Sequence, residues 1–127
     1  MSLRTPLGRV LGNGSAKQGV SHWWVQRLSS VALVPLTLWF IFSLLGLPAF
    51  DYDTVRAWIA DSWTAVFLAL LVATLCYHSW LGIQVVIEDY VHAHGVKLAA
   101  LLCSTFLHAI VAAASLFAVL KIAFQGA

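Results

Sequence analysis

The sequence predicts an all-α integral membrane protein that crosses the bilayer with three helices. Hydrophobic residues make up 61% of the 127 residues and charged residues only 9%, whereas a soluble domain carries charge on about a quarter of its residues. The few charges delimit three long uncharged runs, and these runs lack the alternating pattern of β-barrel strands. The Lys and Arg residues are scattered and form no basic stripe, so nucleic acid is not an expected partner.

Each uncharged run is long enough to span a membrane. The runs cover about residues 28–50, 62–87 and 98–120, which are 23, 26 and 23 residues long. A helix rises about 1.5 Å per residue, so 23 residues extend roughly 34 Å and cross a hydrocarbon core of about 30 Å. We therefore expect residues 1–127 to form one membrane-anchor domain. Its polar tail, residues 1–21, has no apolar core and is not expected to be a cleaved signal peptide.

The distribution of basic residues predicts the orientation of the spans. One side of the membrane receives five of them: Arg4, Arg9, Lys17, Arg27 and Lys97. The other side receives Arg56 and Lys121. Because cytoplasmic segments carry the excess of Lys and Arg, the N-terminus and the second loop are expected inside and the C-terminus outside.

The first span and the loop after it carry helix signals. Pro35 is expected to kink the first helix, and Pro48 to help end it. The polar segment 51–61 is expected to be a short interfacial turn or helix without a chemical role. Four tryptophans near the span ends are expected to be headgroup anchors: Trp23, Trp24, Trp58 and Trp63.

His78 is the first candidate functional residue. It stands ten positions before Glu88, which is about 15 Å along a helix and close to the middle of the bilayer. A polar ring at that depth is expected to face protein, where it either hydrogen-bonds a neighbouring helix or binds a metal or haem. Thr74 and Gly82 lie one turn to each side of it, which would suit either a flat macrocycle or close helix packing.

His108 is a second candidate near the bilayer centre. It stands ten residues after Leu98 in the third span and could either hydrogen-bond a neighbouring helix or face His78 across one haem. The other histidines lie at or outside the membrane interface and are expected to be ordinary polar residues: His22, His92 and His94.

Two acids and a phenol follow at the inner end of the second span. Tyr90 can donate a hydrogen bond to a carbonyl oxygen, and the adjacent carboxylates of Glu88 and Asp89 can orient it or deliver protons. The same residues could simply be a solvated helix end. Arg27, on the same side, could pair with these acids or with an anionic propionate.

Two stretches resemble a known family. The segment Tyr77–Tyr90, YHSWLGIQVVIEDY, ends a membrane span and places Asp-Tyr ten residues after His78. The segment His22–Ser30, HWWVQRLSS, opens the first span. Both are similar to the hydrophobic membrane anchor subunit of succinate dehydrogenase, respiratory complex II, in its alphaproteobacterial and mitochondrial-like form.

The resemblance implies a role for four residues. His78 would be an axial ligand of haem b, and the other axial ligand would come from a second anchor subunit and not from His108. Tyr90 would hydrogen-bond a carbonyl of ubiquinone, with Asp89 beside it. Arg27 would support the haem propionates or the quinone pocket.

The resemblance also implies the surroundings of the chain. The partners would be a second membrane anchor subunit of the cytochrome b556 type, an iron–sulfur subunit and a flavoprotein subunit, all at the bacterial cytoplasmic (inner) membrane. The chain would dock the two hydrophilic subunits and would not catalyse the reaction alone. Two alternatives stay open: a haem-free structural or assembly subunit of another respiratory membrane complex, and a cytochrome b-like subunit that binds haem by itself.

Overall fold

A computed structural model describes residues 5, 7 and 19–125. Within them lie four helices: α2 (Gly19–Leu45), α3 (Tyr52–Ala60), α4 (Ser62–Tyr90) and α5 (His94–Gln125). Three stretches are long and apolar enough to cross a membrane: Val20–Leu45, Ser62–Tyr90 and His94–Gln125. The predicted all-α class with three spanning helices is confirmed. Apart from residues 5, 7 and 19–21, the predicted polar tail lies outside the described residues.

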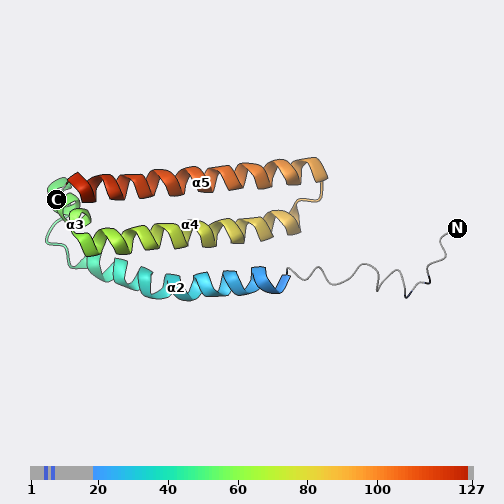
Figure 1. The fold of residues 1–127 in the computed structure, drawn as a ribbon, viewed down its shortest axis with the longest axis horizontal. Helices are drawn as coiled ribbons and strands as arrows, with labels where there is room; N and C mark the ends of the chain where they lie inside the picture. Colours follow the sequence, from blue (N-terminus) through green and yellow to red (C-terminus); the bar gives the residue numbers. More distant parts are fainter. Residues whose placement is uncertain (1–4, 6, 8–18, 126–127) are drawn as a thin grey trace.

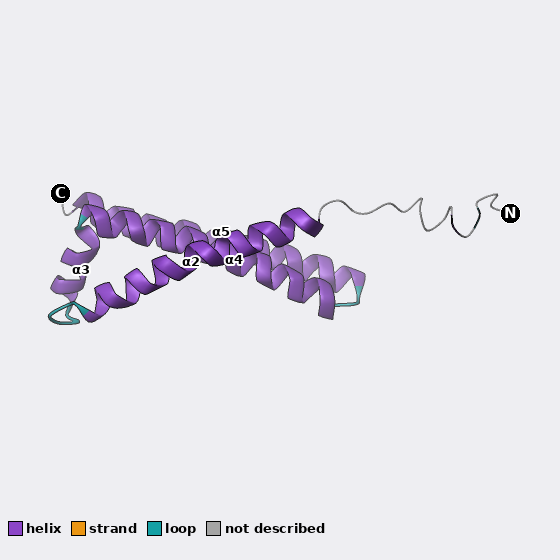
Figure 2. Ribbon diagram, turned by 90° about the horizontal axis from the view of Figure 1, so that it is seen from below, coloured by secondary structure: helices purple, strands orange, loops and turns teal. Residues whose placement is uncertain are grey.

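The three long helices lie side by side, with α4 in the middle (Figure 1). Helix α4 packs against α2 and against α5, and α2 crosses it at a clear angle (Figure 2). The short helix α3 lies across one end, where it contacts α4 and α5. We call this end the α3 end. The opposite end, which holds the start of α2 and the α4–α5 turn at residues 91–93, is the turn end.

In the part of the chain that the structure describes, the buried apolar residues all belong to α4. They are Ala65, Leu68, Leu71 and Leu81. Helix α4 is the long helix with a neighbour on two sides, whereas the large apolar side chains of α2 and α5 are largely exposed. Exposed apolar surface of this extent is stable against lipid or against other apolar protein and unstable in water.

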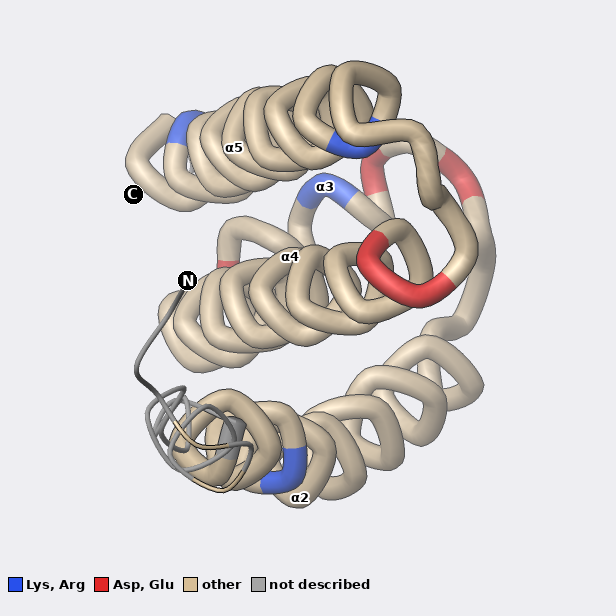
Figure 3. The backbone as a smooth tube through the Cα atoms, turned by 90° about the vertical axis from the view of Figure 1, so that its right-hand side faces the viewer, with Lys and Arg blue, Asp and Glu red and all other residues tan. Residues whose placement is uncertain are grey.

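In the described chain, the middle of each long helix carries no charged residue. Figure 3 shows Lys, Arg, Asp and Glu towards the helix ends and on α3. A charge at the bilayer centre costs several kcal/mol, on the order of 3 kcal/mol by insertion measurements. The arrangement therefore suits three helices that cross a membrane.

The first long helix is shifted towards the N-terminus relative to the uncharged run. It begins at Gly19 and includes Arg27, which is a good helix former and does not interrupt the helix. It ends at Leu45, and the turn after it is closed by bonds from the Gly46 amide to the Phe42 carbonyl at 3.1 Å and from the Leu47 amide to the Leu44 carbonyl at 3.1 Å. Pro48 follows this turn, and Pro35 lies inside the continuous helix.

Aspartates begin the next two helices. The Asp51 carboxylate accepts from the Thr54 amide at 2.9 Å and the Thr54 hydroxyl at 2.8 Å, and Asp61 accepts from the Thr64 amide at 3.0 Å and the Thr64 hydroxyl at 3.1 Å. These are N-caps, which satisfy an otherwise unpaired amide of the first turn. The same bonds, the backbone amide first, lower the pKa of each carboxyl below its ordinary value of 3.8.

Trp58 ties α3 to the end of α2. Its indole N–H donates to the Ser43 hydroxyl at 2.7 Å, and its ring stacks on Trp39 with centroids 6.3 Å apart. Trp58 is half-buried, so it packs between two helices in addition to lying near a span end. The bond from Trp58 fixes α3 across the α3 end.

Candidate functional site

His78 lies just past the middle of α4 on the side that faces α2. Its Nδ1 is 2.9 Å from the Ser29 hydroxyl oxygen, and its Nε2 is 3.5 Å from the Gln26 amide nitrogen. Ser29 is buried, with 8% of its surface exposed, and His78 is half-buried. The ring therefore sits between two helices, as expected for a polar group at this depth.

The Gln26 side chain brings a second polar group to this interface. A Cβ atom at Gly82, one turn from His78, would lie 3.6 Å from the side-chain nitrogen of Gln26. The Gln26 side chain therefore approaches α4 at its smallest residue. The Gln26 Oε1 is buried without a hydrogen-bond partner among the described residues, and so is the His22 Nε2. A buried polar atom left unpaired costs about 1–3 kcal/mol. The interface thus has unmet hydrogen-bonding capacity next to His78.

His108 has a different set of partners. Its Nδ1–H donates to the Ser104 carbonyl at 2.7 Å, and its Nε2 is 3.2 Å from the Ser79 hydroxyl oxygen on α4. Both ring nitrogens are therefore paired between α4 and α5. His78 instead bonds α2, so the structure does not bring the two rings together as a pair.

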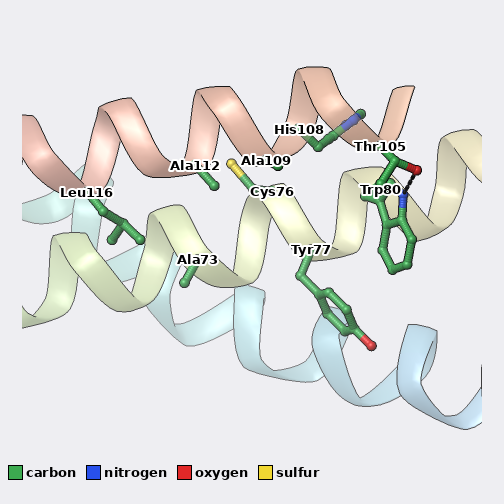
Figure 4. A pocket seen from close by; sticks show the side chains of 9 residues that line it. All are labelled: Ala73, Cys76, Tyr77, Trp80, Thr105, His108, Ala109, Ala112 and Leu116. Carbon is green, nitrogen blue, oxygen red and sulfur yellow. Dashed lines mark hydrogen bonds between the residues drawn. The ribbon is translucent and has the colours of Figure 1, made fainter. Parts of the chain in front are cut away.

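A cavity lies between α4 and α5 beside His108 (Figure 4). It has a volume of about 360 Å³ and is lined by Ala73, Cys76, Tyr77, Trp80, Thr105, His108, Ala109, Ala112 and Leu116. The Trp80 indole N–H donates to the Thr105 hydroxyl at 3.1 Å. The polar atoms of Trp80 and His108 are thus already bonded, and the cavity offers mainly apolar contact. Nothing in the sequence pattern signals it apart from small residues on the third span.

Tyr90 ends α4 at the turn end and is 78% exposed. The neighbouring Glu88 is held in place on two sides. Its carboxylate accepts from the Gln84 side-chain amide at 2.9 Å, and its main-chain carbonyl accepts from the Lys97 ammonium at 2.7 Å. Asp89 is exposed. Tyr90 and Asp89 therefore face outward from an ordered helix end, and both are accessible to another molecule.

The Arg27 side chain stacks on the ring of Trp23, one turn earlier in the same helix. The guanidinium carbon lies 5.4 Å from the centroid of the Trp23 ring, a cation–π contact of about 0.5–1 kcal/mol at an exposed site. The pairing with Glu88 and Asp89 that the sequence suggested is replaced here by this stacking. The side chain is exposed and presents its charge at the turn end.

Among the residues that the structure describes, no three His, Cys, Asp or Glu side chains gather as they would around an ion held by protein ligands alone. A haem iron needs only axial ligands from protein. A half-buried imidazole such as that of His78 could serve as one such ligand.

Comparison with known families identifies the family of the chain. The model of the succinate dehydrogenase/fumarate reductase transmembrane subunit matches residues 1–120. The chain belongs to this family. The resemblance seen in the motifs of the first two spans is thereby confirmed.

The chain is also similar to individual membrane anchor subunits of succinate dehydrogenase. The succinate dehydrogenase hydrophobic membrane anchor subunit of Rickettsia bellii is 30% identical over 94% of this chain and 87% of its own length. That of Paracoccus denitrificans is 29% identical over 92% and 90%. The succinate dehydrogenase membrane anchor subunit of Reclinomonas americana is 29% identical over 65% and 71%. No solved structure matches the chain significantly.

The sequence pattern singled out His78, but its hydrogen-bond partners on α2 were not predicted. Ser29 and Gln26 are 49 and 52 positions from His78. A signal was present: His22, Gln26 and Ser29 recur at helical spacing, which places polar groups on one face of an otherwise apolar helix.

Proposed function

We propose that this chain is the membrane anchor subunit of a succinate:ubiquinone oxidoreductase. In this role it holds the flavoprotein and iron–sulfur subunits at the bacterial cytoplasmic membrane, next to a second anchor subunit. The observation that carries the proposal is His78, a half-buried imidazole just past the middle of an apolar helix. The extensive exposed apolar surface of α2 and α5 supports it, because such surface requires lipid or a partner.

In this proposal, His78 would hold haem b through a ring nitrogen, and the second anchor subunit would provide the other protein ligand. His108 is not proposed as the second ligand, because it bonds Ser79 and Ser104 between α4 and α5 whereas His78 bonds Ser29 on α2. The exposed Arg27 guanidinium would donate hydrogen bonds to a propionate group. When bound, the haem supplies one-electron redox chemistry.

The quinone site in this proposal lies at the turn end. The exposed hydroxyl of Tyr90 donates a hydrogen bond to a ubiquinone carbonyl, and the exposed carboxylate of Asp89 lies next to it. Reduction places negative charge on the quinone oxygen, and a phenol O–H stabilises that charge until a proton arrives. Tyr90 lies 12 residues from His78, roughly 18 Å along the helix, so the headgroup sits at the membrane surface and the haem deeper.

The orientation follows from the same site. The turn end faces the cytoplasm, where the iron–sulfur subunit brings electrons to the quinone. By sequence, the segments on this side carry Arg4, Arg9, Lys17, Arg27 and Lys97, and those on the other side carry Arg56 and Lys121. This excess of five against two supports the orientation under the positive-inside rule.

Purification of the tagged chain from its own membranes tests the proposal. We expect a flavoprotein, an iron–sulfur protein and a second small membrane protein to co-purify, together with the visible absorption bands of a b-type haem. His78→Ala should abolish or strongly reduce the haem bands, whereas His108→Ala should retain them. A wild-type complex without haem absorption would refute haem ligation, and loss of haem only in His108→Ala would assign the ligand to the other histidine.

A further inference from the structure

We infer that Ser29 is a positioning residue that fixes the tautomer and the rotation of the His78 ring, so that Nε2 is the nitrogen that binds iron. This inference rests on the proposed haem ligation. It depends on one hydroxyl group between α2 and α4, and on which hydrogen bonds that hydroxyl can make at the same time.

The Ser29 hydroxyl has a single hydrogen atom. It donates that hydrogen to the Gln26 main-chain carbonyl at 2.9 Å, a bond to the preceding turn that serine commonly makes in a helix. The same oxygen lies 2.9 Å from the His78 Nδ1. With its hydrogen already donated, Ser29 can only accept in this second bond. The proton of the neutral imidazole is therefore on Nδ1.

The tautomer decides which ring nitrogen is available. With Nδ1 protonated, Nε2 carries the lone pair that a metal requires. Among the described residues, the polar contact of Nε2 is the long one of 3.5 Å to the side-chain amide nitrogen of Gln26, which is at the limit of a hydrogen bond. Histidine ligands of metals usually donate their other N–H to an oxygen, which orients the ring and raises its basicity. Ser29 supplies that oxygen here.

Burial strengthens this assignment. Ser29 is 8% exposed and lies among apolar helices, where an unpaired hydroxyl or imidazole N–H costs free energy. The chain of bonds from His78 to Ser29 to the Gln26 carbonyl pairs each of these groups. Alternative rotations of the ring would leave Nδ1–H without an acceptor and are disfavoured.

The adjacent serine provides a matched control. Ser30 also donates its hydroxyl to the Gln26 carbonyl at 2.9 Å, so this bond runs to the main chain and not to His78. Ser29→Ala and Ser30→Ala remove the same atoms one position apart on α2. Both remove a bond to the Gln26 carbonyl, but only Ser29→Ala removes the bond to the ring.

The test compares the two variants in the whole complex, purified from membranes. For Ser29→Ala we expect haem to dissociate more readily, with affinity reduced about 10- to 100-fold as for other partners of metal-bound histidines. The haem that stays bound should have a higher midpoint potential, because a less basic ligand stabilises ferric iron less. Ser30→Ala should match the wild type in both measurements. Ser29→Thr keeps the hydroxyl and should restore both values.

The outcomes separate this inference from the proposed function. If His78→Ala loses haem but Ser29→Ala matches Ser30→Ala in haem retention and potential, the role of Ser29 is refuted and haem ligation by His78 stands. If His78→Ala keeps its haem, the proposed function fails first. Equal haem loss in both serine variants, with unchanged potential, would show that the serines serve only the packing of α2, and would also overturn the inference.

Discussion

Two tyrosines with equal exposure stand at opposite ends of the molecule. Tyr90 ends α4 at the turn end and Tyr52 begins α3 at the α3 end, and each is 78% exposed. Their phenols are chemically alike, so any functional difference between them comes from their location. Only Tyr90 lies at the end to which we assign the quinone site.

This comparison gives a prediction for single substitutions. Tyr90→Phe should lower succinate:quinone reductase activity about 10- to 1000-fold, because one stabilising donor to the developing negative charge is lost. Succinate oxidation with a soluble artificial acceptor should be unchanged. Tyr52→Phe should leave both activities at the wild-type level.

The two assays must be run on the same preparations of the complex. An equal fall of both activities in Tyr90→Phe would place the defect in assembly and contradict a quinone site at Tyr90. An equal effect of Tyr52→Phe on quinone reduction would do the same.

At the level of single helices, the helix starts are set by local chemistry. Asp61 is the residue between α3 and α4 and is the N-cap of α4. Its bonds go to Thr64, three residues further along the chain. Such a cap depends on neighbouring residues and not on distant packing.

Removing this cap should destabilise the complex. Asp61→Ala is expected to lower the thermal unfolding midpoint of the purified complex, while Asp61→Asn, which can still cap, should retain most of it. Asp53→Ala removes an exposed acid from the first turn of α3 without removing a cap and should have a smaller effect. An Asp53→Ala effect as large as that of Asp61→Ala would show that charge and not capping is responsible.

The two caps also predict a pH dependence with a definite sign. Hydrogen bonds from Thr54 and Thr64 lower the pKa of Asp51 and Asp61 below 3.8 in the folded chain. The stabilisation is therefore complete above pH 3.8 and is lost as the pH falls through the lower folded pKa. Thermal midpoints measured across this acidic range should decline less in an Asp51→Asn, Asp61→Asn double variant than in the wild type. An identical decline would contradict the assignment.

For the molecule as a whole, the orientation in the membrane places the two ends in different compartments. Ala93 lies in the α4–α5 turn and Ala49 in the α2–α3 connection, and both are exposed. The proposed orientation puts Ala93 in the cytoplasm and Ala49 outside.

Cysteine labelling tests this arrangement. In intact cells, a membrane-impermeant maleimide should label Ala49→Cys and not Ala93→Cys, and opening the cells should make Ala93→Cys reactive. The wild type is the background control, because Cys76 and Cys103 both lie within spanning helices. Labelling of Ala93→Cys alone in intact cells would reverse the orientation.

The number of membrane-spanning helices could be predicted from the sequence alone. The length of each uncharged run and the cost of a charge in lipid are properties of one segment at a time, so no tertiary information was needed. The aspartates at positions 51 and 61, each three residues before a threonine, likewise set the starts of α3 and α4 locally. The depth of His78 followed from counting along one helix.

Which helix faces meet became known only from the folded arrangement. The spanning helices are largely apolar on all sides, so hydrophobic periodicity does not say which residues of α2 turn towards α4. Their packing placed Ser29 against His78, directed His108 to Ser79, and set α4 between the other two helices. These contacts join residues far apart in the chain through small differences in packing and hydrogen bonding, which the composition of a single segment does not contain.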